Sequence, residues 1–268
     1  MSAERASRYG LRALALGYLS LLLFVPVAIV LYRTFEPGLD AVWASITTPA
    51  AQSAFRLTLL VTIIAVPLNT IFGILAALVL VRGRFRGKAL LDALIDLPFA
   101  VSPIVIGLSL ILVYGTTGWF GDELASLGIQ VIFSVPGIIL ATVFVTLPFV
   151  AREVAPVLRE VGDEQEQAAA TLGASRWQTF ARITLPAIRW GVAYGVILST
   201  ARAIGEFGAV SVVSGKIAGE TETMTLLVEK RFQNFDLAGA YAASALLAVI
   251  ALATLLAMTL IKPRKEHE

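Results

Sequence analysis

Apolar runs of about twenty residues recur along the chain, and runs of that length are typical of membrane-spanning helices. An α-helix rises 1.5 Å per residue, so about twenty residues cross the roughly 30 Å hydrocarbon layer of a bilayer. The pattern predicts an all-α, polytopic membrane protein with six transmembrane helices. The runs lie at residues 12–34, 56–81, 89–114, 132–151, 187–213 and 238–261.

Two of these runs carry proline pairs, Pro98 with Pro103 and Pro136 with Pro148. Proline lacks a backbone N–H and bends a helix, but membrane helices tolerate such bends where neighbouring helices or water satisfy the freed carbonyls. Both runs are therefore still expected to span the membrane.

Composition also indicates a membrane protein. Hydrophobic residues make up 57% of the 268 residues and charged residues only 15%, with a mean hydropathy of +0.83. Soluble domains carry about 25% charged residues, and a soluble core of this length has no room for so much apolar surface. The net charge of +2 is too small to indicate a nucleic-acid partner.

Two residue types on which many enzymes depend are scarce. There is no cysteine, which excludes disulfides, thiolate metal sites and cysteine nucleophiles. The single histidine, His267, lies next to the end of the sequence, which argues against Ser-His-Asp catalysis and histidine-based metal centres. We therefore expect no catalytic residue and no metal site in this chain.

Lys and Arg residues are distributed unevenly between the two sides of the predicted membrane. If the spans alternate in direction, most of the 21 fall at the two termini, in the RGRFRGK turn and in the segment between the fourth and fifth spans. Because cytoplasmic loops carry the excess of Lys and Arg, both termini are predicted to be cytoplasmic. The first apolar run is too long for a cleaved signal peptide and lacks a small-residue cleavage site, so we expect a retained helix.

The polar segment before the fifth span carries the signals of two short helices. Asp163, Glu164 and Glu166 precede an alanine run, and acidic residues favour the positive N-terminal end of a helix. Gly173 can adopt the left-handed conformation that ends such a helix. Ser175 with Gln178, three residues later, fits a capping box that opens a second helix.

This second helix is expected to present an apolar face before the fifth span begins. Trp177, Phe180 and Ile183 recur at helical spacing, and Pro186 suits the first turn of the span, where its missing N–H costs nothing. The segment at about 160–184 therefore predicts a helix-turn-helix elbow on the cytoplasmic face. Its alanines offer a small, smooth surface that a groove of another protein can receive.

The stretch QAAATLGASRWQTFARITLP resembles the EAA loop of ABC importer permeases, whose pattern is E-A-A, three residues, Gly, nine residues and I-x-L-P. Gln167 stands where the family has glutamate, and Glu166 directly precedes it. Whether Glu166 makes the family's acidic contact to the ATPase, or that contact is lost, stays open. The residues that match the pattern are Ala168, Ala169, Gly173, Ile183, Leu185 and Pro186.

The resemblance extends over about residues 10–260. DLPFAVSPIVIGL (96–108), RWGVAYGVILSTARAIGEFGAVSVVSG (189–215) and GETETMTLLVE (219–229) resemble W-type (CysW-type) permease subunits of bacterial sulfate and thiosulfate importers. Molybdate permeases share the GEFGA and GET elements. The resemblance therefore leaves sulfate, thiosulfate, molybdate and tungstate as alternative substrates.

This family resemblance implies the type I ABC importer permease fold and an inner-membrane location. The segment 1–50 would hold the N-terminus, the first transmembrane helix and an external loop, 51–262 the permease core, and 263–268 a cytoplasmic tail. The implied partners are a second, T-type permease subunit, two cytoplasmic ATPase subunits that use ATP and Mg²⁺, and an external sulfate-binding protein. The chain itself would bind no cofactor, and a homodimeric permease remains an alternative to the heterodimer.

Arg202 and Glu206 lie inside the fifth span, where charges are costly. An unpaired charge at the centre of a bilayer costs about 3 kcal/mol or more, so both side chains are expected to face the bundle interior or water. They are four residues apart on one helix face and can pair, with Arg202 roughly 22 Å from the cytoplasmic end of the span. In one interpretation, Arg202 adds positive potential to an anion pathway and Glu206 limits how tightly the anion is held. In the other, the two residues form a structural ion pair.

Three further residues are candidates for the pathway. Ser102, beside Pro103, is a possible pathway hydroxyl, although most serines in membrane helices bond their own backbone. Gly205 and Gly208 flank the charged pair and can let the helix bend.

Functions of other classes remain to be distinguished. A secondary anion transporter or channel would act without ATP and usually contains inverted repeats, which the sequence does not display. A membrane-bound enzyme would need a clustered catalytic set. The favoured prediction is a permease subunit that couples to ATPases by alternating access and catalyses no reaction itself.

Overall fold

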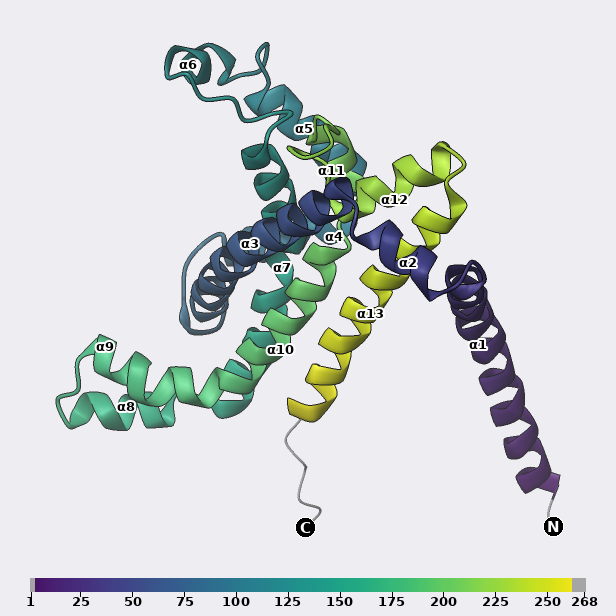
Figure 1. The fold of residues 1–268 in the computed structure, drawn as a ribbon. Helices are drawn as coiled ribbons and strands as arrows, with labels where there is room; N and C mark the ends of the chain where they lie inside the picture. Colours follow the sequence, from purple (N-terminus) through teal and green to yellow (C-terminus); the bar gives the residue numbers. More distant parts are fainter. Residues whose placement is uncertain (1–2, 262–268) are drawn as a thin grey trace.

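A computed structural model describes residues 3–261, and within this range every regular element is a helix (Figure 1). The predicted tail at 263–268, with His267, lies outside the described residues. In chain order the helices are α1 (Ala3–Phe35), α2 (Leu39–Ile46), α3 (Pro49–Arg82), α4 (Lys88–Ala100), α5 (Pro103–Tyr114), α6 (Gly121–Ser126), α7 (Val135–Val161), α8 (Glu164–Thr171), α9 (Arg176–Thr179), the π-helix η1 (Phe180–Thr184), α10 (Leu185–Ile204), α11 (Gly208–Val213), α12 (Met224–Gln233) and α13 (Leu237–Ile261).

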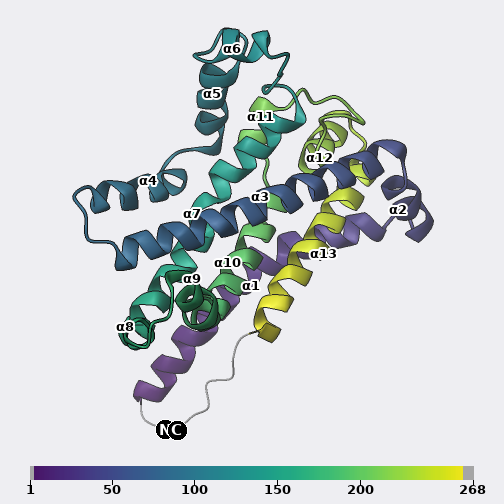
Figure 2. The ribbon, with the colours of Figure 1, turned by 90° about the vertical axis from the view of Figure 1, so that its left-hand side faces the viewer.

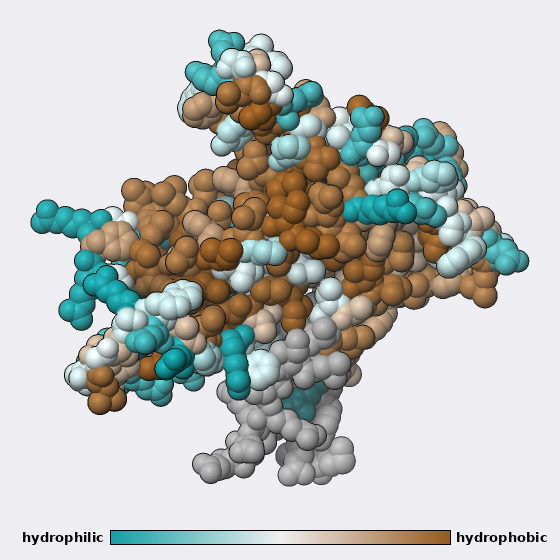
Figure 3. All heavy atoms as spheres, turned by 60° about the vertical axis from the view of Figure 1, so that its left-hand side comes forward, coloured by the Kyte–Doolittle hydropathy of each residue, from teal (hydrophilic) through white to brown (hydrophobic). Residues whose placement is uncertain are grey.

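Five helical stretches of the described range are long and apolar enough to cross a membrane, and a bent helix pair brings the number to six when it is counted as one span. The prediction of six spans is therefore confirmed. A broad hydrophobic band crosses the face of the molecule seen in Figure 3, with hydrophilic residues at its edges. The spans are Gly10–Phe35, Pro49–Arg82, Val135–Val161, Arg176–Ile204 and Leu237–Thr254, with α4 and α5 as the bent pair.

The third predicted run, 89–114, is not one continuous helix, because α4 and α5 meet at an angle of 112°. Val101 and Ser102 between them have extended backbones, with ψ of 137° and 134°. A residue before proline avoids the helical region, and Pro103 has no N–H to continue the ladder. The expected bend is thus a complete break.

The fifth predicted run, 187–213, differs from the expectation at both ends. It stops at Ile204, and α11 begins separately at Gly208. At its start Pro186 lies in the first turn of α10, as expected, but the chain does not break there, because α9 and η1 lead into α10 without interruption. The π-helical turn, in which Leu185 N–H donates to Phe180 O five residues back, lets the helix pass the proline.

The core of the bundle is built by α3, α7 and α10, which pack at very close range. Val150 of α7 lies fully buried between Gly73 of α3 and Gly195 of α10. A Cβ at Gly73 would lie 2.6 Å from Val150 Cβ, and one at Gly195 would lie 2.7 Å from Val150 Cα. Only glycine permits these approaches at Gly73 and Gly195.

A polar contact adds to this packing. The buried Asn69 of α3 donates to Val143 O at 2.9 Å and to Thr146 Oγ1 at 2.7 Å, both on α7. In a membrane such a contact fixes the register of two helices, because the alternative is an unpaired amide among apolar side chains.

The two ends of the molecule carry different elements. The end of α5 and the short α6 project at one end, whereas α8 and α9 lie at the other (Figure 2). α1 begins and α13 ends at the same end as α8 and α9 (Figures 1 and 2). α1 stands apart from the core and contacts α2 and α13.

Candidate coupling loop and translocation pathway

The predicted elbow is present as two short helices joined by a left-handed glycine. α8 carries Glu164 and Glu166 in its first turn, and Gly173, with φ of 82°, ends it. Ser175 caps α9 with a complete capping box, in which Ser175 Oγ accepts from Gln178 N–H and Gln178 Oε1 accepts from Ser175 N–H. These local predictions are confirmed.

The elbow exposes a mixed surface at its end of the bundle. Gln167 and Ala168 are exposed, and Ala169 is half-buried. Leu172 is 89% exposed and Trp177 72% exposed, which is unusual for large apolar side chains on a polar segment. Because the sequence predicts this segment as the ATPase-coupling loop, we name these five residues the coupling face.

The second half of the EAA-like pattern lies at the start of the membrane helix. Ile183 is half-buried, whereas Leu185 and Pro186 are exposed. Ile183 and Pro186 line an open hollow of about 490 Å³ together with Gln165, Arg182 and Arg189. This hollow lies between α8 and the first turns of the long helix.

Glu166 does not lie on the coupling face. Its carboxylate pairs with Arg82 at the end of α3, with Nε–Oε2 and Nη2–Oε1 distances of 3.1 and 3.2 Å. It also accepts a hydrogen bond from Thr184 Oγ1 at 3.0 Å. Sequence reasoning missed Arg82 as a functional residue because the two charges are 84 positions apart and no local pattern links them.

The predicted ion pair in the fifth span is formed. Arg202 Nη1 lies 2.6 Å from Glu206 Oε2, and the side chains are 33% and 1% exposed, respectively. Within residues 3–261 the guanidinium of Arg202 makes this ion pair but no hydrogen bond, so most of its five donors remain available. The arginine is thus the partner that can meet a ligand.

Glu206 instead connects the end of the fifth span to the helices that follow it, α11 and α12. Its Oε1 accepts from Ala209 N–H at 2.9 Å and caps α11, while its backbone carbonyl accepts from Thr225 Oγ1 of α12. A cavity of about 10 Å³ lies beside it, lined by side chains that include Thr58, Thr142 and Thr223. That volume suffices for about one water molecule.

The breaks of the third and fifth spans touch each other. A Cβ at Gly208 would lie 2.7 Å from Pro103 Cβ, so α11 and α5 begin in direct contact. Ser102 is the N-cap residue of α5, is exposed, and its hydroxyl makes no capping bond. Gly205 has an ordinary φ of −91° and free space around it, so its backbone does not require glycine, whereas Gly208 is required by packing.

The structure brings the predicted residues together as two groups rather than one. The coupling group lies around α8 and the first turn of α10, and the pathway group lies at the other end of α10. The helix from Arg176 to Ile204 joins them without a break. Movement of the elbow can therefore be carried mechanically to the Arg202 region.

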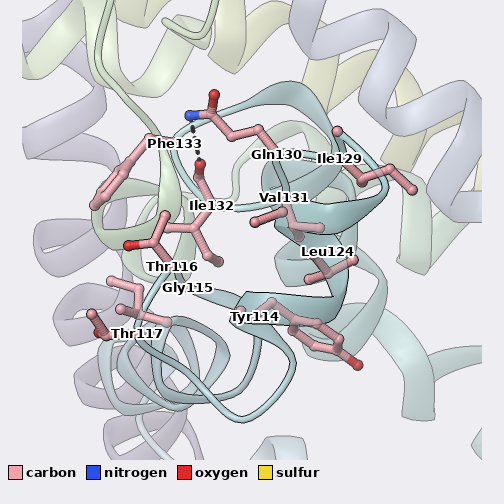
Figure 4. A pocket seen from close by; sticks show the side chains of 14 residues that line it. Tyr114, Gly115, Thr116, Thr117, Leu124, Ile129, Gln130, Val131, Ile132 and Phe133 are labelled. Atoms are coloured by element: carbon pink, nitrogen blue, oxygen red, sulfur yellow. Dashed lines mark hydrogen bonds between the residues drawn. The ribbon is translucent and has the colours of Figure 1, made fainter.

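A separate pocket of about 480 Å³ lies between α5, α6 and the segment before α7 (Figure 4). Tyr114, Leu124 and Ile129 contribute to its mostly apolar lining, and on the segment before α7 Gln130 Nε2 donates to Ile132 O at 3.2 Å. None of the predicted site residues lines it. Its position at the far end of α5 separates it from the ion pair and the elbow.

Within the described residues, no group of three or more His, Cys, Asp or Glu side chains is placed to hold a metal ion. The acidic residues before and within α8 do not converge on one point, since Glu166 is bound to Arg82. The charged groups instead tie helices to one another.

Sequence relatives align over nearly the whole chain. The "Sulfate transport system permease protein CysW" of Synechocystis sp. is 51% identical over 260 residues, covering 97% of this chain and 94% of the relative. The protein of the same name from Escherichia coli (strain K12) is 46% identical, covering 92% and 85%. The "Sulfate transport system permease protein CysT" of Escherichia coli (strain K12) is 42% identical, covering 90% and 86%.

Solved structures share the fold at lower identity. A chain of a bacterial ABC transporter involved in the import of the acidic polysaccharide alginate superposes with a TM-score of 0.79 at 19% identity, covering 98% of this chain and 97% of that chain. A chain of the alginate transporter in complex with its periplasmic protein gives the same TM-score at 17% identity, covering 97% and 95%. Residues 69–267 match the family described as "Binding-protein-dependent transport system inner membrane component". The chain belongs to this family of permeases, and its fold is that of type I ABC importers.

Proposed function

We propose that this chain is the membrane-spanning permease subunit of an ATP-driven sulfate importer that also accepts thiosulfate. Relatives named as sulfate permeases at 46% and 51% identity support this substrate class. The observation that carries the mechanism is the continuous helix Arg176–Ile204, which joins the coupling elbow to Arg202. The chain performs no covalent chemistry, and ATP and Mg²⁺ are used by partner ATPases.

The proposed assembly contains four kinds of subunit. A T-type permease pairs with this chain, and the similarity to a CysT protein at 42% identity is consistent with two related permeases in one complex. Two ATPase subunits bind at the coupling face, and an external binding protein delivers the anion. The Lys and Arg distribution supports an arrangement with both termini in the cytoplasm.

In the proposed cycle, ATP closes the ATPases and displaces α8. The displacement turns the long helix and switches the pathway between inward and outward openings, as two states whose balance a ligand shifts. Arg202 adds positive potential for the dianion, while Glu206, through its bonds to Arg202 and Ala209, holds the guanidinium in place. Ser102 and Gly208 lie at the neighbouring break and shape the passage.

The proposal is tested by anion uptake into proteoliposomes that contain this chain, its T-type partner, the ATPase and the binding protein. Uptake of sulfate is expected to require ATP and every component. Uptake by this chain alone without ATP would instead indicate a secondary transporter or channel. Competition with thiosulfate, molybdate and tungstate tests the substrate class, and a preference for molybdate or tungstate over sulfate would refute it.

A matched pair of variants at Gly173 tests the elbow in the same assay. Proline fixes φ at about −65° and cannot adopt the φ of 82° found at Gly173, so Gly173→Pro should break the turn between α8 and α9. Gly173→Asn is the control, because asparagine tolerates the left-handed region and no atom lies within 4 Å of the new Cβ. The proline variant is expected to assemble in the membrane without transport, and the asparagine variant to transport.

A further inference from the structure

The end of α3 carries an arginine, Arg82, that joins three helices, α3, α7 and α8. Arg82 Nη1 donates to Leu158 O at 3.1 Å and its Nη2 donates to Gly162 O, so it caps the carboxyl end of α7. The same guanidinium binds both oxygens of Glu166 on α8. Two other basic residues of the turn, Arg84 and Arg86, are exposed and make no such bonds to any residue that the structure describes.

Glu166 extends the network to the membrane helix. Its Oε1 accepts from Thr184 Oγ1 in η1, the turn that leads into α10. Arg82 and Glu166 side chains are each 23% exposed, and Thr184 is buried. A two-bond arginine–carboxylate contact that is largely shielded from water is both stronger and more directional than an exposed pair.

Apart from this network, α8 packs against α9 and η1 and is joined to its neighbours in the chain through two glycines. Gly162, with φ of 71°, separates α8 from α7, and Gly173, with φ of 82°, separates it from α9. A push on α8 could then be absorbed by rotation at these two glycines. The bonds of Glu166 to Arg82 and to Thr184 connect α8 to both α3 and η1 and prevent that rotation.

We propose that Arg82 is a positioning residue for coupling: through Glu166 it locks α8 to the ends of α3 and α7, so that displacement of α8 by the ATPase moves these helices together with α10. This inference rests on the proposed importer function and assigns a role to a residue outside the EAA-like pattern. It also gives Glu166 an internal partner, so the ATPase would meet Gln167 and the alanines of the coupling face.

The test compares Arg82→Gln with Arg84→Gln in the complete four-component importer. Both substitutions remove one positive charge from the same turn, but only the first removes the bonds to Glu166, Leu158 and Gly162. The readout is the number of sulfate ions imported per ATP hydrolysed, measured per assembled complex. Arg82→Gln is expected to lower this ratio about fivefold or more while basal ATP hydrolysis stays within about twofold, and Arg84→Gln to match wild type.

Two milder variants separate coupling from assembly. Glu166→Gln leaves the Arg82 bonds to Leu158 O and Gly162 O intact, and Thr184→Val removes only the hydroxyl at similar volume. Both are expected to lower the number of sulfate ions imported per ATP. The double variant Arg82→Gln with Glu166→Gln should not lower this ratio below that of the more affected single variant, because both substitutions break the same contact. Arg82→Lys should recover part of the loss.

Failure of the Arg82 role can be distinguished from failure of the importer assignment. If the wild-type complex imports no sulfate with ATP, the importer assignment fails before any variant is compared. If wild type transports and an assembled Arg82→Gln complex keeps the wild-type ratio, the positioning role is refuted. If Arg82→Gln does not assemble, Glu166→Gln decides, and a wild-type ratio there refutes the role equally.

Discussion

Replacing Arg202 and Glu206, singly and together, distinguishes a structural ion pair from a pathway arginine. The structural consequences differ for the two residues. Glu206 is buried and serves both Arg202 and Ala209 N–H, whereas one third of the Arg202 side chain is exposed. Glu206→Gln keeps an oxygen for Ala209 N–H, while Arg202→Gln leaves a buried carboxylate without its counter-charge.

The magnitudes follow from these contacts. Arg202→Gln should destabilise the complex by about 3–4 kcal/mol, because removing one partner of a buried pair leaves the other charge uncompensated. Glu206→Gln should cost less, about 1–2 kcal/mol, since the remaining guanidinium can reach water and the α11 cap persists. The double variant removes both charges, and its loss of stability should be close to that of Glu206→Gln, which corresponds to a coupling energy of about 3–4 kcal/mol.

The assay combines thermal unfolding of the detergent-solubilised complex with ATP-driven sulfate uptake. We expect the double variant to recover the stability lost in Arg202→Gln but not the uptake, which should remain at least about tenfold below that of Glu206→Gln. That result assigns Arg202 to the anion pathway. Recovery of both stability and uptake would refute the reasoning and leave the pair with a purely structural role.

Three further substitutions have outcomes that the packing predicts. Gly195→Ala should lower the unfolding midpoint by an amount equivalent to about 1–3 kcal/mol, because its Cβ meets the Val150 backbone; an unchanged midpoint would contradict the packing. Asn69→Ala should lower the stability by about 1–3 kcal/mol by the same measurement, since it removes the hydrogen bonds to Val143 O and Thr146 Oγ1 and leaves a gap. Asn69→Asp should not recover this stability, because a carboxylate cannot donate these bonds. Gly173→Val should abolish ATP coupling, with a strain of about 1 kcal/mol or more, whereas uptake equal to that of Gly173→Asn would exclude a role for the left-handed turn.

Local features of the elbow were predictable because their causes lie within a few residues. The Ser175–Gln178 capping box, the left-handed Gly173 and the acidic first turn of α8 each depend on neighbours in the sequence. Pro186 lies in the first turn of α10, as its missing N–H predicted. The π-helical turn that joins α9 to α10 without a break was not predicted.

The candidate site was predictable only in part. Arg202 and Glu206 were identified because a charge inside an apolar run is costly wherever the run packs, and their spacing of four residues allowed the pair. Which partner remains accessible was not predictable. The burial of Glu206 follows from α11 and α12, which close over it through Ala209 and Thr225.

The sequence by itself therefore determined the number and approximate extent of the membrane spans, since the length of an apolar helix is set by the thickness of the bilayer. Tertiary structure alone decided the contact of Pro103 with Gly208 and the bond between Arg82 and Glu166. These features depend on segments far apart along the chain. Their energies come from shape and charge matched across helices, and no local pattern of residues encodes that match.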